Sequence, residues 1–258
     1  MPQTKIAFFD IDGTLIDMQT KQITPKTVEA LHRLQDSGVK LCIATGRSPM
    51  VLPKIADIEF DAYLTFNGSL CYDKQGVIFS NPIPHADVLH FIRNAAALGR
   101  PVCVSTKNRL AANGTDADLA DYFAIANEPL SIAEDFDAVC HEDIYQLMLG
   151  CREKDYPALL DGVPGAKIAA WWDRAVDVIP ASGGKGIGIE KLLAYFGIDR
   201  ADALAFGDGN NDREMLLTVG TGVAMENGSP ELKAIADAVC GPVDRDGVYW
   251  YCAENGLI

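Results

Sequence analysis

The sequence predicts an α/β protein built on a doubly wound parallel sheet, with a second, α+β domain inserted into it. Three observations support this prediction. Short apolar runs alternate with amphipathic stretches in the first third of the 258-residue chain, the same rhythm returns in the last third, and the apolar runs of the middle come partly in neighbouring pairs. Alternating strands and helices are typical of a parallel sheet covered on both faces, whereas paired strands indicate an antiparallel sheet.

The first third predicts a strand–helix–strand–helix–strand pattern. The apolar run Ile6–Phe9 is the first expected strand. Thr24 and Pro25 provide an N-cap and a proline at the first helical position, and Gly38 ends the helix that follows. Further along we expect a strand over Val39–Ala44, a short helical stretch after Pro49 and a strand near Tyr63–Phe66.

The last third repeats the pattern. A helix is expected to begin at Lys185 and to end at Phe196, because Gly197 follows as a C-terminal cap. Strand, helix, strand, helix and strand then follow in order, and we assign them to Ala203–Phe206, Asp212–Leu217, Gly222–Met225, Pro230–Ala236 and Ala238–Cys240.

The middle of the chain, residues 82–181, is expected to form the inserted domain, and residues 1–81 with 182–258 the core. Its paired strands predict an antiparallel sheet with helices on one face. The expected elements, in order, are a helix, two strands, a helix, a strand, a helix and two strands: Ala86–Leu98, Val102–Ser105, Leu110–Asn113, Ala117–Ile125, Tyr145–Leu149, Tyr156–Leu160, Lys167–Trp172 and Val176–Ile179.

Charge and cysteine usage exclude several classes of partner. Lys and Arg number 22 against 36 Asp and Glu, a formal net charge of −14 that disfavours nucleic acid and anionic membranes. The seven scattered cysteines show no C-x-x-C spacing, which favours free thiols in a reducing compartment over disulfides or zinc. No apolar run has the length of a signal peptide core or a membrane span, so a cytoplasmic location is expected. The sequence predicts no oligomeric state.

Two carboxylates end the first expected strand. Asp10 and Asp12 are two residues apart, so the alternation of a strand directs both to one side, and Gly13 lets the chain turn directly afterwards. Two like charges at the end of a buried apolar strand are costly unless a cation lies beside them. Taken alone, such an Asp-x-Asp-Gly stretch is equally compatible with an ordinary loop.

A second acidic cluster, containing Asp208 and Asp212, ends a strand of the last third. Ligands of open parallel sheets bind beyond the carboxyl ends of the strands, so both clusters are expected at one crevice. Oxygen ligands without His or Cys favour a hard cation such as Mg²⁺. An EF-hand is excluded because Arg213 and Val219 stand where Gly and Glu are needed, and Gly184-Lys185-Gly186 is no Walker loop.

Two further elements are suited to an anion. Thr45 and Gly46 end the second strand and provide a hydroxyl and an approachable amide, and Lys185 opens a helix after two glycines. Taken singly, Thr45 is also compatible with a helix cap and Lys185 with a solvated side chain.

In this order the four elements resemble the haloacid dehalogenase superfamily of phosphohydrolases. Asn67-Gly68 after the third strand, and the order of elements in the insertion, resemble the Cof-like branch with its class IIB cap domain. The resemblance covers essentially the whole chain and implies a Rossmann-like core. The matching motifs are Asp10-x-Asp12-x-Thr14, Thr45-Gly46-Arg47, Lys185 and Gly207-Asp208-Gly209-x-Asn211-Asp212.

The resemblance implies a role for each motif residue. Asp10 is the expected nucleophile, which forms an aspartyl phosphate, and Asp12 the general acid/base. Asp10, Asp208 and the backbone carbonyl of Asp12 are expected to hold Mg²⁺, and Asp212 to anchor the water shell of the metal. The residues expected to hold phosphoryl oxygens are Thr45, Gly46, Lys185 and Asn211.

The expected substrate is a small phosphorylated metabolite, most readily a sugar phosphate. Alternatives are another small phosphate such as pyridoxal phosphate or a nucleotide, a phosphotransferase or mutase activity, and a non-catalytic sugar-phosphate binding protein. A mutase of the best-known kind carries a helical cap between Gly13 and Lys40, where this chain has room for one helix. In the inserted domain, Trp171, Trp172 and Arg174 are the candidates for substrate contact, although both tryptophans are also suited to packing.

Overall fold

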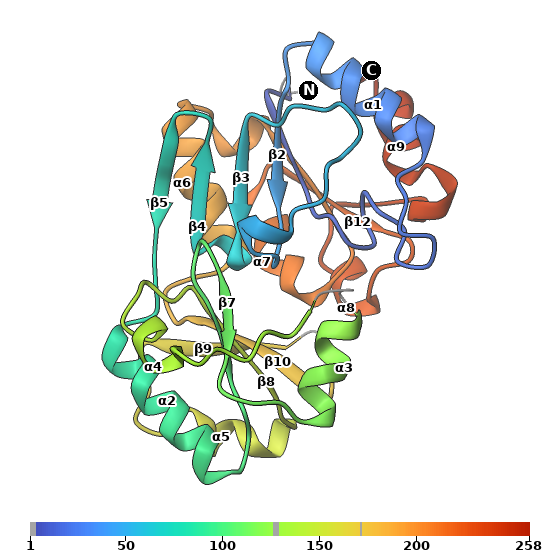
Figure 1. Cartoon of the computed structure of the whole chain (residues 1–258). Helices are drawn as coiled ribbons and strands as arrows, with labels where there is room; N and C mark the ends of the chain where they lie inside the picture. Colours follow the sequence, from blue (N-terminus) through green and yellow to red (C-terminus); the bar gives the residue numbers. More distant parts are fainter. Residues whose placement is uncertain (1–3, 126–128, 171) are drawn as a thin grey trace. The chain divides into compact units, whose positions relative to one another are not determined.

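The computed structural model describes residues 4–125, 129–170 and 172–258, and the chain divides into two compact units (Figure 1). The first unit comprises Met1–Arg47, Leu52–Ser80 and Gly184–Ile258, and the second comprises Ser48–Val51 and Asn81–Gly183. Among the described helices, none combines the length and the apolar character that crossing a membrane requires.

The first unit is built on an eight-stranded sheet in the order β13-β12-β11-β1-β2-β3-β4-β5. The six strands from β13 to β3 run parallel, and β4 and β5 add an antiparallel hairpin at one edge. The strands are β1 Ile6–Phe9, β2 Lys40–Ala44, β3 Ala62–Thr65, β4 Leu70–Asp73, β5 Gly76–Ser80, β11 Ala203–Gly207, β12 Thr221–Met225 and β13 Ala238–Cys240.

Helices cover both faces of this sheet, which confirms the doubly wound α/β class. Side chains alternate along β1, so Phe9 joins one apolar cluster with α1 and α9, and Phe8 joins another with α6, α7 and α8. Thr24 caps α1 by accepting a hydrogen bond from the Thr27 N–H, and Gly197 ends α6 in the left-handed conformation. The helices are α1 Pro25–Asp36, α6 Lys185–Phe196, α7 Arg213–Thr218, α8 Pro230–Lys233 and α9 Gly247–Glu254.

The second unit contains a five-stranded antiparallel sheet in the order β7-β6-β8-β10-β9. Near the two ends of its longer segment, Asn81–Gly183, Asn81 Nδ2 donates a hydrogen bond to Ser182 Oγ at 3.3 Å. The elements are α2 His85–Ala97, β6 Cys103–Ser105, β7 Leu110–Ala112, α3 Ala117–Ile125, α4 Phe136–Val139, β8 Gln146–Gly150, α5 Tyr156–Leu159, β9 Ala166–Ala169 and β10 Ala175–Pro180.

The expectation that all helices of the second unit lie on one face is wrong. Helices α2, α4 and α5 pack against the strand face that carries Leu147 and Leu149. Helix α3 packs against the opposite face, where Leu119 and Phe123 join Met148 in a separate cluster. The apolar stripe of a helix shows that it packs on a sheet, but it does not show which face the helix covers.

Two strands and two helices lack a counterpart in the sequence-based assignment. The β4–β5 hairpin, α4 and α9 all occur in stretches to which no element was assigned. The hairpin turns at Asp73, whose carboxylate accepts hydrogen bonds from the N–H groups of Gln75 and Gly76. This is a side-chain turn signal of the kind that Asp supplies. The expected short helical stretch after Pro49 is a 3-10 turn, Pro49–Val51.

Candidate active site

Two aspartates follow neighbouring parallel strands near the middle of the eight-stranded sheet. β1 ends at Phe9 and β11 at Gly207, and the register pairs Phe9 with Phe206. Asp10 and Asp208 therefore lie side by side at the carboxyl edge of the sheet. The chain continues from β1 to β2 on one side while β11 lies on the other, so the strand order reverses here, as is usual for a ligand crevice.

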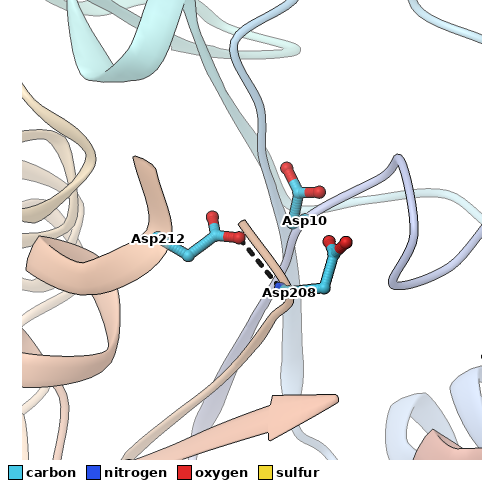
Figure 2. A group of neighbouring side chains, drawn as sticks. All are labelled: Asp10, Asp208 and Asp212. Atoms are coloured by element: carbon cyan, nitrogen blue, oxygen red, sulfur yellow. Dashed lines mark hydrogen bonds between the residues drawn. The ribbon is translucent and has the colours of Figure 1, made fainter. Parts of the chain in front are cut away.

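Asp212 completes a group of three carboxylates. One oxygen from each of Asp10, Asp208 and Asp212 lies within 4.8 Å of the others, an arrangement that could hold a metal ion (Figure 2). Asp212 Oδ2 accepts hydrogen bonds from the backbone N–H groups of Asp208 at 3.0 Å and Gly209 at 2.9 Å. The 3-10 turn Asn210–Asp212 thus folds this carboxylate back onto the end of β11.

Lys185 brings a positive charge to the group of three carboxylates, and its side chain is 0% exposed. Its Nζ donates to Asp10 Oδ1 at 2.7 Å and to Asp212 Oδ1 at 2.5 Å. Lys185 is the first residue of α6 and follows Gly184, whose φ of +145° is rare for a residue with a side chain. Although burial disfavours the charged ammonium, Asp10 and Asp212 raise the pKa of Lys185 above its ordinary value, so the ammonium stays protonated.

Three carboxyl groups lie beside the single ammonium group of Lys185, so ionising all three is costly. Burial raises the pKa of Asp10 well above its usual range, against the opposing effect of Lys185. Burial, with the charge of Asp212, raises the pKa of Asp208 to about 7, while Thr14 opposes the rise by donating to Oδ1 at 3.2 Å. Within the described part of the chain, neither Asp10 Oδ2 nor Asp208 Oδ2 accepts a hydrogen bond. A carboxylate oxygen on the buried Asp10 and one on the half-buried Asp208, each without a donor from the described chain, fit a hard divalent cation that binds through oxygen.

Thr45 and Asp12 both meet Arg47. Thr45 lies buried directly after β2, and its Oγ1 accepts a hydrogen bond from the Arg47 N–H at 3.1 Å, which leaves the hydroxyl proton available for another acceptor. The Arg47 guanidinium forms an ion pair with the Asp12 carboxylate. The sequence motif contains Arg47, but sequence reasoning gave it no role, since no local pattern shows which carboxylate an arginine reaches.

Asn67 connects two of the expected phosphate-binding residues. Its Oδ1 accepts a hydrogen bond from Asn211 Nδ2 at 3.1 Å, and a Cβ at Gly46 would lie 3.1 Å from Asn67 Nδ2. Phe66 and Asn67 both have φ of +51°, a conformation that costs energy for residues other than glycine. Sequence reasoning noted Asn67-Gly68 but did not place Asn67 in the site; an Asn-Gly pair after a strand was the signal.

The candidates for substrate contact, Trp171, Trp172 and Arg174, belong to the second unit. The Arg174 guanidinium donates to Asp118 and Asp121, and its carbon atom lies 5.0 Å from the centroid of the Trp172 ring. Trp172 packs partly against the apolar cluster that includes Met148. Trp171 lies outside the described residues.

Known proteins resemble the chain over its whole length. The profile of the haloacid dehalogenase-like hydrolases matches residues 7–251. "Putative phosphatase YkrA" of Bacillus subtilis (strain 168) is 34% identical over 261 residues, which cover 99% of each chain. The 5-amino-6-(5-phospho-D-ribitylamino)uracil phosphatase YitU of the same organism is 27% identical, with 95% of each chain covered.

A solved structure supports the same assignment. The HAD subclass IIB sugar phosphatase BT4131 superposes with a TM-score of 0.89 at 29% identity, and the match covers 99% of this chain and 100% of that one. The family profile, the relatives and this likeness confirm the resemblance seen in the motifs. The chain therefore belongs to the haloacid dehalogenase-like hydrolases, and it is a phosphatase of their Cof-like branch.

Proposed function

We propose that the chain is a Mg²⁺-dependent phosphatase that hydrolyses small phosphorylated metabolites, with sugar phosphates preferred, through an aspartyl phosphate on Asp10. One observation supports this proposal above the others. Asp10 and Asp208 each present a carboxylate oxygen without a hydrogen-bond donor from the described chain, beside the buried cation Lys185. This arrangement suits a site in which the Asp10 carboxylate both binds a divalent cation and attacks the phosphoryl group.

Asp10, Asp208 and the backbone carbonyl of Asp12 would hold Mg²⁺, and Asp212 would support them from behind. When bound, the ion would supply positive charge against the phosphoryl oxygens. Such charge is needed, because a carboxylate and one phosphate charge 4 Å apart repel by about 4 kcal/mol at an effective dielectric constant near 20. Lys185 provides part of it from within the chain.

The chain's own residues then perform two displacements. An Asp10 oxygen bonds to phosphorus while the bond from phosphorus to the leaving oxygen breaks, and Asp12 gives its proton to that oxygen. Water next attacks phosphorus, Asp12 accepts a proton from it, and the bond to Asp10 breaks. Thr45, Gly46, Lys185 and Asn211 would hold the phosphoryl oxygens throughout. These donors, held in place by the chain, would stabilise the charge that develops on the phosphoryl oxygens in both steps.

The substrate class is supported by likeness and by charge. A structural neighbour of the same cap subclass is named a sugar phosphatase. The net charge of −14 disfavours polyanionic partners such as nucleic acid. We place substrate selection in the inserted unit, residues 82–181. The name of YitU favours, as a second candidate, a phosphate that carries a sugar-alcohol chain on a heterocycle.

The deciding experiment measures phosphate release from a panel of phosphorylated metabolites with Mg²⁺ present, ranked by kcat/KM, for the wild type and for Asp10→Asn. We expect turnover by the wild type and none by Asp10→Asn, whose fold should persist because Asp212 still pairs with Lys185. Asp36→Asn, on the exposed end of α1, is the matched control for the loss of one carboxylate. Repeated turnover by pure Asp10→Asn protein would refute the nucleophile, and nucleotides or pyridoxal phosphate ranking above every sugar phosphate would refute the substrate class alone.

A further inference from the structure

Asp12 and Arg47 form a two-point ion pair within the first unit, across 35 residues of sequence. Arg47 Nε donates to Asp12 Oδ2 at 2.7 Å, and Arg47 Nη2 donates to Asp12 Oδ1 at 2.8 Å. Because both carboxylate oxygens are held, the pair fixes the plane of the carboxyl group as well as its position. The side chains of Arg47 and Asp12 are 23% and 29% exposed, so the pair is partly shielded from water.

The backbone of Arg47 is itself held on both sides. Its N–H donates to Thr45 Oγ1 at 3.1 Å, and its carbonyl oxygen accepts from the Phe66 N–H at 3.0 Å. The guanidinium therefore extends from a fixed point just beyond the end of β2. Because its backbone is held and its guanidinium group is planar, Arg47 has few alternative positions for its N–H donors. This rigidity suits a residue that orients another side chain.

We propose that Arg47 is a positioning residue, which orients the Asp12 carboxyl group for proton transfer to the leaving oxygen. This inference rests on the proposed function, in which Asp12 is the general acid/base. Asp12 lies in the loop after β1, where its backbone forms an isolated β-bridge with Ile16, and both oxygens of its carboxyl group accept hydrogen bonds from Arg47. A proton donor must lie within hydrogen-bond reach of its acceptor at the correct angle, and a small misplacement costs a large factor in rate. Arg47 keeps its own protons throughout.

The test separates leaving groups by their need for a proton. A sugar alkoxide must be protonated as it departs, whereas p-nitrophenolate leaves without help. The parameter is kcat/KM, which reports the steps through formation of the phosphoenzyme. For Arg47→Gln we expect kcat/KM to fall roughly 30-fold with the best sugar phosphate and less than about 3-fold with p-nitrophenyl phosphate, since general acid catalysis contributes about 10²–10⁴-fold. For Arg47→Lys we expect a loss of kcat/KM with the sugar phosphate that is smaller than that of Arg47→Gln. The lysine keeps the charge, but its ammonium group does not hold both oxygens of Asp12.

Two controls isolate the orientation effect. Arg33→Gln removes the same charge from the exposed face of α1 and should leave both kcat/KM values unchanged. In an Asp12→Asn background, Arg47→Gln should cause no further loss with the sugar phosphate, because the group that it orients is already gone. Thermal unfolding establishes that each variant is folded; if Arg47→Gln does not fold, Arg47→Lys and its Asp12→Asn combination carry the same comparison.

Several outcomes would overturn the inference. Equal losses on both substrates, with a raised inhibition constant for inorganic phosphate, would mean that Arg47 binds the phosphoryl group directly. Losses that multiply in the double variant would mean that Arg47 acts independently of Asp12. An active wild type with an unchanged substrate ratio in Arg47→Gln would refute the inference alone, whereas a wild type inactive on every phosphate would refute the proposed function and this inference with it.

Discussion

Lys185 Nζ lies 2.7 Å from Asp10 Oδ1, although 175 residues separate the two in sequence. Lys185 reaches Asp10 because α6 begins beside the carboxyl end of the central strand, where Gly184 lies against Gly68 so closely that a side chain on Gly68 would collide with the Gly184 carbonyl. The ammonium bridges Asp10 and Asp212, so one buried cation serves two buried carboxylates. Such an arrangement is costly to disrupt on one side only.

Lys185→Met should therefore destabilise the protein and abolish activity. Removing the ammonium leaves Asp10 and Asp212 buried without their shared partner, and breaking a buried pair in this way costs about 3–5 kcal/mol. Urea unfolding in EDTA at pH 7 measures the change in the free energy of unfolding. Lys191→Met, an exposed position on the same helix, should change it by less than about 0.5 kcal/mol. Equal stability of Lys185→Met and Lys191→Met would show that Lys185 does not neutralise the carboxylates.

Activity should require Mg²⁺. Dialysis against EDTA should remove it, and Mg²⁺ should restore it. Ca²⁺ should inhibit, because its looser geometry allows both oxygens of Asp10 to bind the ion and so blocks attack on phosphorus. Asp208→Asn should raise the Mg²⁺ concentration for half-maximal activity by about tenfold or more, since a ligand charge is lost, whereas Asp36→Asn should not. Full activity after EDTA treatment and dialysis would rule out the proposed metal site.

The stability of the second unit should depend on Asp118 in a pH-dependent way. Asp118 accepts hydrogen bonds from Arg100, Arg152 and Arg174, and its side chain is 12% exposed. The bond from Arg152 lowers the pKa of Asp118 from 3.8 to about 2, against the opposing effect of burial and with help from Arg174. Asp118 therefore takes up its proton at a lower pH in the folded state than in the unfolded state. The stabilisation by the ionised carboxylate is present above pH about 4 and is lost as the pH falls towards 2.

At pH 7, Asp118→Asn should lower the free energy of unfolding by about 1–2 kcal/mol, an estimate reduced because the partner arginines are partly exposed. The difference between wild type and variant should shrink steadily between pH 4 and pH 2. Urea unfolding followed by tryptophan fluorescence measures it at each pH. Asp121→Asn, which loses one exposed contact with Arg174, should cost less than about 0.5 kcal/mol. A difference independent of pH would contradict the ionic origin of the effect.

Substrate selection should depend on Trp172 more than on Arg174. Because Arg174 is engaged by Asp118 and Asp121, Arg174→Ala should mainly reduce stability. Trp172→Ala should lower kcat/KM for sugar phosphates about tenfold relative to p-nitrophenyl phosphate if the indole stacks on the sugar, a contact worth about 1 kcal/mol or more. Trp250→Ala on the exposed face of α9 is the control, and Trp171→Ala is measured alongside. Unchanged ratios in Trp171→Ala, Trp172→Ala and Arg174→Ala would show that this segment does not read the substrate.

The sequence by itself determined the fold class and the place of the acidic groups. Apolar runs of strand length mark β1 and β11, and the polar residues directly after them must lie at the carboxyl edge of a parallel sheet. Local chemistry also determined the helix ends at Thr24 and Gly197, because a cap depends on neighbouring residues alone. These features are encoded within a few positions of each other, so they can be read along the chain.

Only the tertiary structure decided which distant side chains meet. The Asp12–Arg47 pair and the hydrogen bond from Asn211 to Asn67 depend on the order of strands in the sheet and on the path of each loop. The position of α3 on the second face of its sheet depends likewise on the connection that precedes it. Helical periodicity and residue type describe one element at a time, whereas these contacts form between elements far apart in sequence, and the packing of the whole core selects them.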